Sequence, residues 1–229
     1  MIKAVMLDFS GTLFRIESAA EWLSAVVADA GLTVPEDERD ACVGRLEEFG
    51  AQPGGVPPRR VPPHLEELWR ERDLTAERHR AAFTAMTREA GLPAADLDEA
   101  LYERSQMSEA WQPYADAEAT LRALRGRGIP IAVVSNIGWD MRPVFRDHGL
   151  DDLVDAYFLS FKCGVKKPDP RIFQMACDKL GVEPGDALMV GDEPLADSGA
   201  AALGCQVHLL DPLPVDRRPS ALAEVLQLL

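Results

Sequence analysis

Four side chains suited to phosphate chemistry follow apolar segments of this sequence. Asp8 and Asp192 bring carboxylates, Ser135 brings a hydroxyl and Lys167 brings an ammonium group. Two converging carboxylates can hold Mg²⁺, which needs only one or two of them besides waters and a substrate phosphate. The hydroxyl and the ammonium group can hold the oxygens of a transferred phosphoryl group. Together these residues predict attack by Asp8 on phosphorus through an aspartyl-phosphate.

The elements that must position these residues alternate along the chain. Apolar runs predict strands at 3–9, 130–136, 156–160, 187–192 and 206–211. Segments of helical length lie at 115–127, 140–149, 169–181, 194–204 and 218–228. This alternation predicts an α/β fold, a Rossmann-like parallel sheet covered on both faces. The four side chains fall at or after the carboxyl ends of strands, which meet at the edge where such sheets bind ligands.

A long insertion separates the first strand from the second. Residues 15–110 show helical patterning and no good strand, and Pro35 followed by three acidic residues predicts a helix start. Further helices are expected at 75–90 and 95–108, whereas the proline-rich stretch 51–63 is expected to be a loop. We therefore predict a discontinuous core, formed by residues 1–14 and 111–229, and a helical domain over residues 15–110.

Composition narrows the class of protein. The net charge of −14 disfavours a nucleic-acid partner, because a polyanion would be repelled. No run of ~18 apolar residues exists, and the N-terminal segment is too short for a signal peptide, so we expect no membrane partner and a cytoplasmic location. Four cysteines lie far apart without ligand spacing: Cys42, Cys163, Cys177 and Cys205. The expected partner is a small molecule, and the oligomeric state is left open.

Residues 1–14 and 111–211 resemble the haloacid dehalogenase-like (HAD) hydrolases in the order and spacing of four motifs. The matching stretches are DFSGTLF, VVSN, KKPDP and GDEPLAD. The resemblance implies that Asp8 is the nucleophile and binds Mg²⁺ with Asp192, while Asp197 supports the site. It also implies that Ser135 and Lys167 hold the phosphate, and the lysine directly before Pro-Asp matches the motif better than Lys166.

The resemblance extends to neighbouring positions. The backbone carbonyl of Ser10 is implied as a metal ligand, Thr12 as a supporting residue, and Asn136 as a turn residue that also binds phosphate. The insertion 15–110 lies where the family carries its helical C1 cap. Such a cap closes over the site and selects the substrate.

Ser10 departs from the family pattern. Most HAD phosphatases carry a second aspartate here, which protonates the leaving oxygen and later activates water. A hydroxyl without assistance does neither near neutral pH, and losing a general acid–base typically lowers the rate ~10² to 10⁴-fold. Phosphonate-cleaving relatives also lack this aspartate but use a cap lysine, and residues 15–110 contain no lysine. The ion-pumping ATPases carry a hydroxyl here but need a membrane span.

Two function classes remain open. The first is a Mg²⁺-dependent phosphatase of a small phosphorylated metabolite. Its substrate would have a good leaving group or its own proton donor, or the cap would supply the acid, with Glu17 and Glu21 as the nearest candidates. The second is a nearly inactive phosphate-binding or regulatory module. A 2-haloacid dehalogenase is a further alternative, but its relatives need no magnesium and Asp192 argues against it.

Overall fold

A computed structural model describes most of the 229-residue chain, namely residues 1–94, 97–218 and 220–229. These residues form two compact units, Met1–Arg15 with Gln112–Leu229, and Ile16–Trp111. The chain passes between the units along two short paired strands, β2 (Phe14–Ile16) and β3 (Trp111–Pro113).

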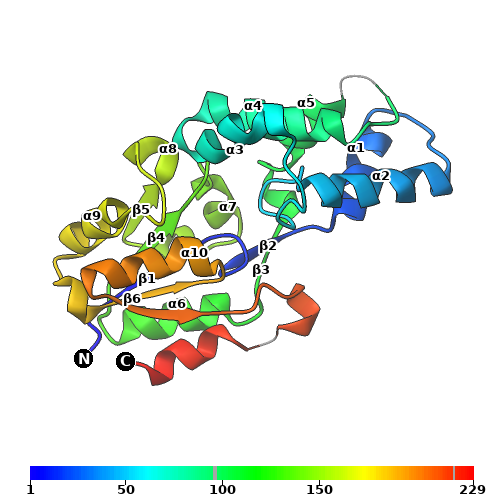
Figure 1. Ribbon diagram of the computed structural model, residues 1–229. Helices are drawn as coiled ribbons and strands as arrows, with labels where there is room; N and C mark the ends of the chain where they lie inside the picture. Colours follow the sequence, from blue (N-terminus) through cyan, green and yellow to red (C-terminus); the bar gives the residue numbers. More distant parts are fainter. Residues whose placement is uncertain (95–96, 219) are drawn as a thin grey trace. The chain divides into compact units, whose positions relative to one another are not determined.

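The first unit contains a five-stranded parallel sheet with the strand order β5-β4-β1-β6-β7 (Figure 1). Its strands are β1 (Ala4–Leu7), β4 (Ile131–Ser135), β5 (Ala156–Leu159), β6 (Ala187–Gly191) and β7 (Gln206–Leu209). The central strands β4, β1 and β6 are buried along their whole length, which explains their continuous apolar sequences. The predicted Rossmann-like α/β fold is thus confirmed.

Helices cover both faces of this sheet. They are α6 (Ala117–Gly126), α7 (Arg142–Asp147), α8 (Ser160–Cys163), α9 (Pro170–Leu180) and α10 (Pro194–Asp197). Helix α9 packs Ile172 and Phe173 into a cluster with Met6 and Val134 of the sheet. Helix α6 lies on the opposite face (Figure 1), where it packs on β4 and on a C-terminal 3₁₀ helix. With both faces covered, the carboxyl-terminal edge is the place left for a ligand.

Several predicted helices are shorter than expected, among them 140–149, of which the structure forms α7 (Arg142–Asp147). The segment 194–204 is α10 followed by the 3₁₀ helix Ser198–Leu203, and the described residues of 218–228 form the 3₁₀ helix Leu222–Gln227. A β-carbon on Gly199 would lie 2.3 Å from the Pro168 carbonyl oxygen, so a neighbouring backbone shapes the first segment. Of the helix predicted at 95–108, residues 95–96 lie outside the described residues, and the helix ends at Arg104.

The second unit is helical. Its α-helices are α1 (Ala19–Asp29), α2 (Glu36–Phe49), α3 (Glu66–Glu71), α4 (Ala76–Glu89) and α5 (Leu97–Arg104). Helix α1 starts with a capping box between Ser18 and Glu21, and α2 starts directly after Pro35 as predicted. The loop over 51–63 contains no α-helix, also as predicted. In the described ranges, no helix is both long and apolar enough to span a membrane.

Shorter 3₁₀ helices complete the two units. They lie at Pro63–Leu65, Arg72–Leu74, Ser108–Ala110, Asp151–Leu153, Pro184–Asp186 and Val215–Arg217.

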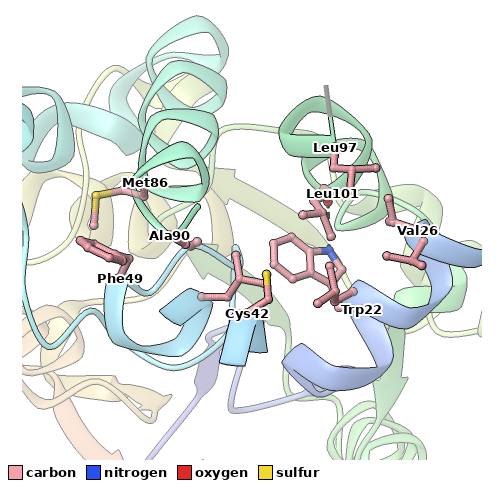
Figure 2. Packing of buried hydrophobic residues seen from close by; sticks show 12 residues of the cluster. Trp22, Val26, Cys42, Phe49, Met86, Ala90, Leu97 and Leu101 are labelled. Carbon is pink, nitrogen blue, oxygen red and sulfur yellow. Dashed lines mark hydrogen bonds between the residues drawn. The ribbon is translucent and has the colours of Figure 1, made fainter. Parts of the chain in front are cut away.

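The helical unit has its own apolar core (Figure 2), in which Trp22 faces Leu101. Both side chains are fully buried, and the Trp22 indole N–H donates to the Leu101 carbonyl oxygen at 2.9 Å. Pairing the indole satisfies its one polar atom, so a large aromatic ring can be buried without an unpaired donor. Cys42 lies in the same core as a buried free thiol.

Truncating Leu101 to alanine should lower the free energy of unfolding by about 2–5 kcal/mol, because it removes a fully buried side chain and leaves a cavity beside Trp22. Urea denaturation monitored by tryptophan fluorescence measures the change. Leu195→Ala is the control, since that side chain is 82% exposed, and its effect should stay within about 0.5 kcal/mol. Equal effects of the two variants would contradict this assignment of the core.

Candidate active site

The strand order brings the predicted residues to one edge of the sheet. Asp8 follows β1, Ser135 ends β4 and Asp192 follows β6, and these three strands are adjacent and parallel. The Asp8 backbone N–H donates to the Val190 carbonyl oxygen at 2.9 Å, which ties the end of β1 to the end of β6. Lys167 reaches the same edge from the loop between α8 and α9, with a cis peptide bond to Pro168.

Lys167 is a buried cation held between two carboxylates. Its Nζ lies 2.6 Å from Asp197 Oδ1 and 3.0 Å from Asp8 Oδ1, and its side chain is 1% exposed. Burial lowers the pKa of Lys167, but the charges of Asp8 and Asp197 and their hydrogen bonds outweigh burial and raise it above its ordinary value. Lys167 is therefore a permanent positive charge at the site, since breaking such a buried pair would leave an uncompensated charge.

Three carboxylates surround this single cation. Asp8, Asp192 and Asp197 each offer an oxygen atom, and the three atoms lie within 4.8 Å of one another. Burial raises the pKa of Asp8, and burial together with the charges of Asp8 and Asp197 raises the pKa of Asp192 to about 7. Anionic oxygens gathered this closely fit a hard divalent cation such as Mg²⁺, which would relieve their repulsion.

The three carboxylates differ in the hydrogen bonds that they accept. Asp197 accepts from Lys167 on one oxygen and from the Glu193 backbone N–H, at 2.9 Å, on the other. Asp192 Oδ1 accepts a hydrogen bond from the Thr12 hydroxyl at 3.3 Å. Asp197 thus has both carboxylate oxygens engaged, as suits a supporting residue, whereas the Lys167 and Phe9 contacts of Asp8 both involve Oδ1.

The loop after Asp8 requires glycine where the sequence has it. Gly11 has a φ of +75°, and a β-carbon there would lie 2.2 Å from Asp192 Oδ2. Gly191 is constrained in the same way, because its β-carbon would lie 2.0 Å from Asp197 Oδ2. Both glycines let backbone pass directly beside a carboxylate. Neither glycine is among the predicted site residues, although each belongs to one of the four motifs.

Asn136 has a clear structural role. Its side-chain amide donates to the Lys167 carbonyl oxygen at 2.9 Å and accepts from the Lys167 N–H at 2.7 Å. This reciprocal pair fixes the backbone that carries Lys167, and phosphate binding by Asn136 stays a prediction. Ser135, 4% exposed, is the last residue of β4 and lies next to Asn136 at the same edge.

The two glutamates considered as replacement acids are engaged elsewhere. Both carboxylate oxygens of Glu17 accept from Arg104 at 2.8 Å within the helical unit. Glu21 accepts from the Ser18 hydroxyl and backbone N–H, and these bonds lower the pKa of Glu21. A proton donor near neutral pH needs a raised pKa, so the environment of Glu21 does not suit the missing acid at position 10, and Glu17 is already engaged by Arg104. Ser10 itself is half-buried in a β-bridge with Phe14.

One residue at the edge of the site gave no signal in the sequence. The Arg218 guanidinium donates to the carbonyl oxygens of Gly11 and Thr12 in the loop after Asp8. Arg218 is 207 residues from Gly11 and stands outside every motif, so only the folded chain could reveal it.

The chain belongs to the haloacid dehalogenase-like hydrolases. The profile of that family, described as a haloacid dehalogenase-like hydrolase, matches residues 2–204. The (S)-2-haloacid dehalogenase 4A of Burkholderia cepacia is 31% identical over 195 residues, covering 80% of each chain. Haloacid dehalogenase-like hydrolase domain-containing protein 3 of Bos taurus is 38% identical over 124 residues. The match covers 53% of this chain and 49% of that protein, so the chain spans about half the length of the domain-containing protein 3 that it matches.

Phosphatases also occur among the relatives. The phosphoserine phosphatase of Thermus thermophilus is 35% identical over 129 residues, which cover 55% of this chain and 51% of that protein. A solved HAD phosphatase from Thermococcus onnurineus has 26% identity and a TM-score of 0.58, covering 92% of this chain and 86% of that one. A solved dehalogenase has 24% identity and a TM-score of 0.67, and the match covers 100% of this chain and 97% of that one. The two proteins share the fold.

The raised pKa of Asp192 predicts a pH-dependent stability that a metal ion changes. The folded pKa, about 7, exceeds the ordinary value of 3.8, so the folded chain binds more protons and loses stability as pH rises through that window. A cation on the ionised carboxylates should reverse this loss. Mg²⁺ should therefore raise the thermal unfolding midpoint more at pH 8 than at pH 5. Each kcal/mol that Mg²⁺ adds to the free energy of unfolding should raise the midpoint by about 2–4 °C.

Differential scanning calorimetry in chelator and in Mg²⁺ tests this. Asp192→Asn should remove its share of the pH dependence and most of the Mg²⁺ effect. A Mg²⁺ shift of equal size at both pH values, or one unchanged in the variant, would show that Asp192 does not hold the cation.

Proposed function

We propose that this chain is a Mg²⁺-dependent phosphatase of a small phosphorylated molecule, with Asp8 as the nucleophile. The observation that carries the proposal is the cluster of three carboxylates, two of which pair with the buried Lys167. A 2-haloacid dehalogenase has no chemical need for a carboxylate such as Asp192 beside its nucleophile, whereas a phosphatase needs a cation between two anions.

The donor set fits Mg²⁺. Asp8, Asp192 and the Ser10 carbonyl would hold it, with Thr12 and Asp197 supporting the carboxylates. When bound, the ion supplies positive charge that lets an anionic carboxylate approach an anionic phosphate.

The side chains divide the remaining work. An Asp8 carboxylate oxygen forms a bond to phosphorus, and the bond to the leaving oxygen breaks with its electron pair. Lys167 has three N–H donors, of which its two carboxylate partners use two, so one is left for a phosphate oxygen. The Ser135 hydroxyl binds a second phosphate oxygen. Water then hydrolyses the aspartyl-phosphate, giving inorganic phosphate and free Asp8.

We assign to the helical unit, Ile16–Trp111, the role of a cap that selects the substrate. It is inserted between β2 and β3 and has its own core, so its surface can vary without disturbing the sheet. This assignment corresponds to the predicted domain over residues 15–110.

A 2-haloacid dehalogenase is the second candidate. Its specific support is Ser10, because a halide leaves as a stable anion and needs no proton, so the missing carboxylate costs the first step of this reaction nothing. The similarity to the Burkholderia cepacia dehalogenase over 80% of each chain agrees with it. In that reaction Asp8 would displace the halide from carbon to form an ester, which water would then hydrolyse.

Two assays on the same preparation separate these candidates. One follows phenolate release from p-nitrophenyl phosphate, and the other follows halide release from 2-chloropropionate, each with Mg²⁺ and with chelator. We expect phosphatase turnover that chelation or Asp192→Asn abolishes, and Asp8→Asn should be inactive in both assays. Halide release that survives chelation would establish the dehalogenase. Absence of turnover and of phosphate on Asp8 would leave the binding module.

Restoring the missing carboxylate should speed turnover of the phosphate. In the natural chain, rapid mixing with p-nitrophenyl phosphate should show a burst near one equivalent of phenolate and then a slow rate, because Ser10 cannot activate water. Ser10→Asp should shorten the life of the aspartyl-phosphate and raise the steady rate ~10² to 10⁴-fold. Ser10→Asn is the matched control, since it adds similar bulk without a base.

A different result would be informative. If the natural chain shows no burst and Ser10→Asp gains nothing, another group already handles the proton.

A further inference from the structure

Arg218 is a buried arginine in the C-terminal segment that contacts the loop after the nucleophile. It is 3% exposed, and its two terminal nitrogens donate to the Gly11 and Thr12 carbonyl oxygens. Its guanidinium carbon lies 3.1 Å from the centroid of the Tyr114 ring. The Tyr114 hydroxyl in turn donates to the Leu213 carbonyl oxygen at 2.7 Å, so the ring that supports Arg218 is itself fixed.

The loop needs this outside donor. Within the loop, the Leu13 and Phe14 N–H groups donate to the Phe9 carbonyl oxygen, and the Gly11 N–H donates to the Phe14 carbonyl oxygen. The Gly11 and Thr12 carbonyl oxygens instead accept hydrogen bonds from Arg218. Without the guanidinium, two inward-facing carbonyl oxygens would lose their charged donor, and the loop would relax to find other partners.

The same loop contacts a carboxylate of the acidic cluster. The Thr12 hydroxyl donates to Asp192 Oδ1, and the Gly11 backbone passes so close to Asp192 that no β-carbon fits between them. The loop also begins at Asp8, whose carboxylate accepts from the Phe9 N–H at 2.8 Å. A shift of residues 9–12 therefore moves the nucleophile and the support of Asp192 together.

We propose that Arg218 is a positioning residue, which clamps the loop of residues 9–12 so that Asp8 and Asp192 keep their geometry. The effect of Arg218 on the order of the loop does not depend on the reaction, whereas its effect on turnover rests on the proposed phosphatase function. An arginine suits the position because its planar fork reaches two carbonyl oxygens at once and stacks on an aromatic ring. A lysine offers a point charge and does neither.

The experiment compares Arg218→Ala and Arg218→Lys with a matched control, Arg127→Ala. Arg127 also donates from a terminal nitrogen to a carbonyl oxygen, that of Leu226 at 2.8 Å, but on an exposed surface away from the loop. Amide hydrogen exchange of residues 9–14 is measured without metal or substrate, so its outcome does not depend on the proposed function. We expect exchange faster by about 10- to 100-fold in both Arg218 variants and unchanged in the control.

Turnover of p-nitrophenyl phosphate supplies the second measurement. Both Arg218 variants should lose kcat with little change in KM, and ethylguanidinium, which can occupy the space left in Arg218→Ala, should restore part of the kcat and of the exchange protection. If Arg218→Ala does not fold, Arg218→Lys carries the test. Unchanged exchange at residues 9–14 in a folded variant would overturn the proposal. So would faster exchange spread evenly over the sheet, because that would show a general loss of stability.

Discussion

The buried charge on Lys167 constrains the rest of the first unit. An ammonium group that is 1% exposed is stable only beside carboxylates, and it has Asp8 on one side and Asp197 on the other. Asp8 follows β1 and Asp197 ends α10 after β6, so the ion pair holds together segments that are far apart in sequence. Asn136, after β4, then fixes the backbone of Lys167 through two hydrogen bonds. The order of the strands and the placement of this one charge therefore depend on each other.

The second constraint is the close approach of the backbone to the carboxylates. Three carboxylates within 4.8 Å of one another leave no room for side chains on the backbone that passes them, and Gly11 and Gly191 occupy the two tightest positions. The three negative charges outnumber the one positive charge of Lys167, and burial together with the charges of Asp8 and Asp197 raises the pKa of Asp192. A cation is the simplest group that would balance these charges, so the same geometry suits a metal-dependent reaction.

Much of this could be predicted from the sequence, for reasons particular to each element. Buried parallel strands such as β4 and β6 are continuous apolar runs, and a polar residue directly after such a run must lie at the carboxyl-terminal edge. Asp8, Ser135 and Asp192 are of this kind. Helix lengths near the C-terminus were wrong, because contacts with distant backbone, as at Gly199, override local propensity. Arg218 could not be predicted, since its partners are backbone carbonyl oxygens and leave no trace in the sequence around them.

Ser10 links this geometry to the choice of chemistry. Attack by Asp8 requires a carboxylate and positive charge, and the described site provides the carboxylate, Lys167 and a cluster suited to a cation. Departure of an alkoxide requires a proton, and the glutamates nearest in sequence are held by Arg104 and by Ser18. Substrates whose leaving group is already a stable anion, such as acyl and aryl phosphates or a halide, avoid that requirement. In the proposed reaction, a serine at position 10 favours substrates with an acidic leaving group, and the cap role proposed for the helical unit adds selection by shape.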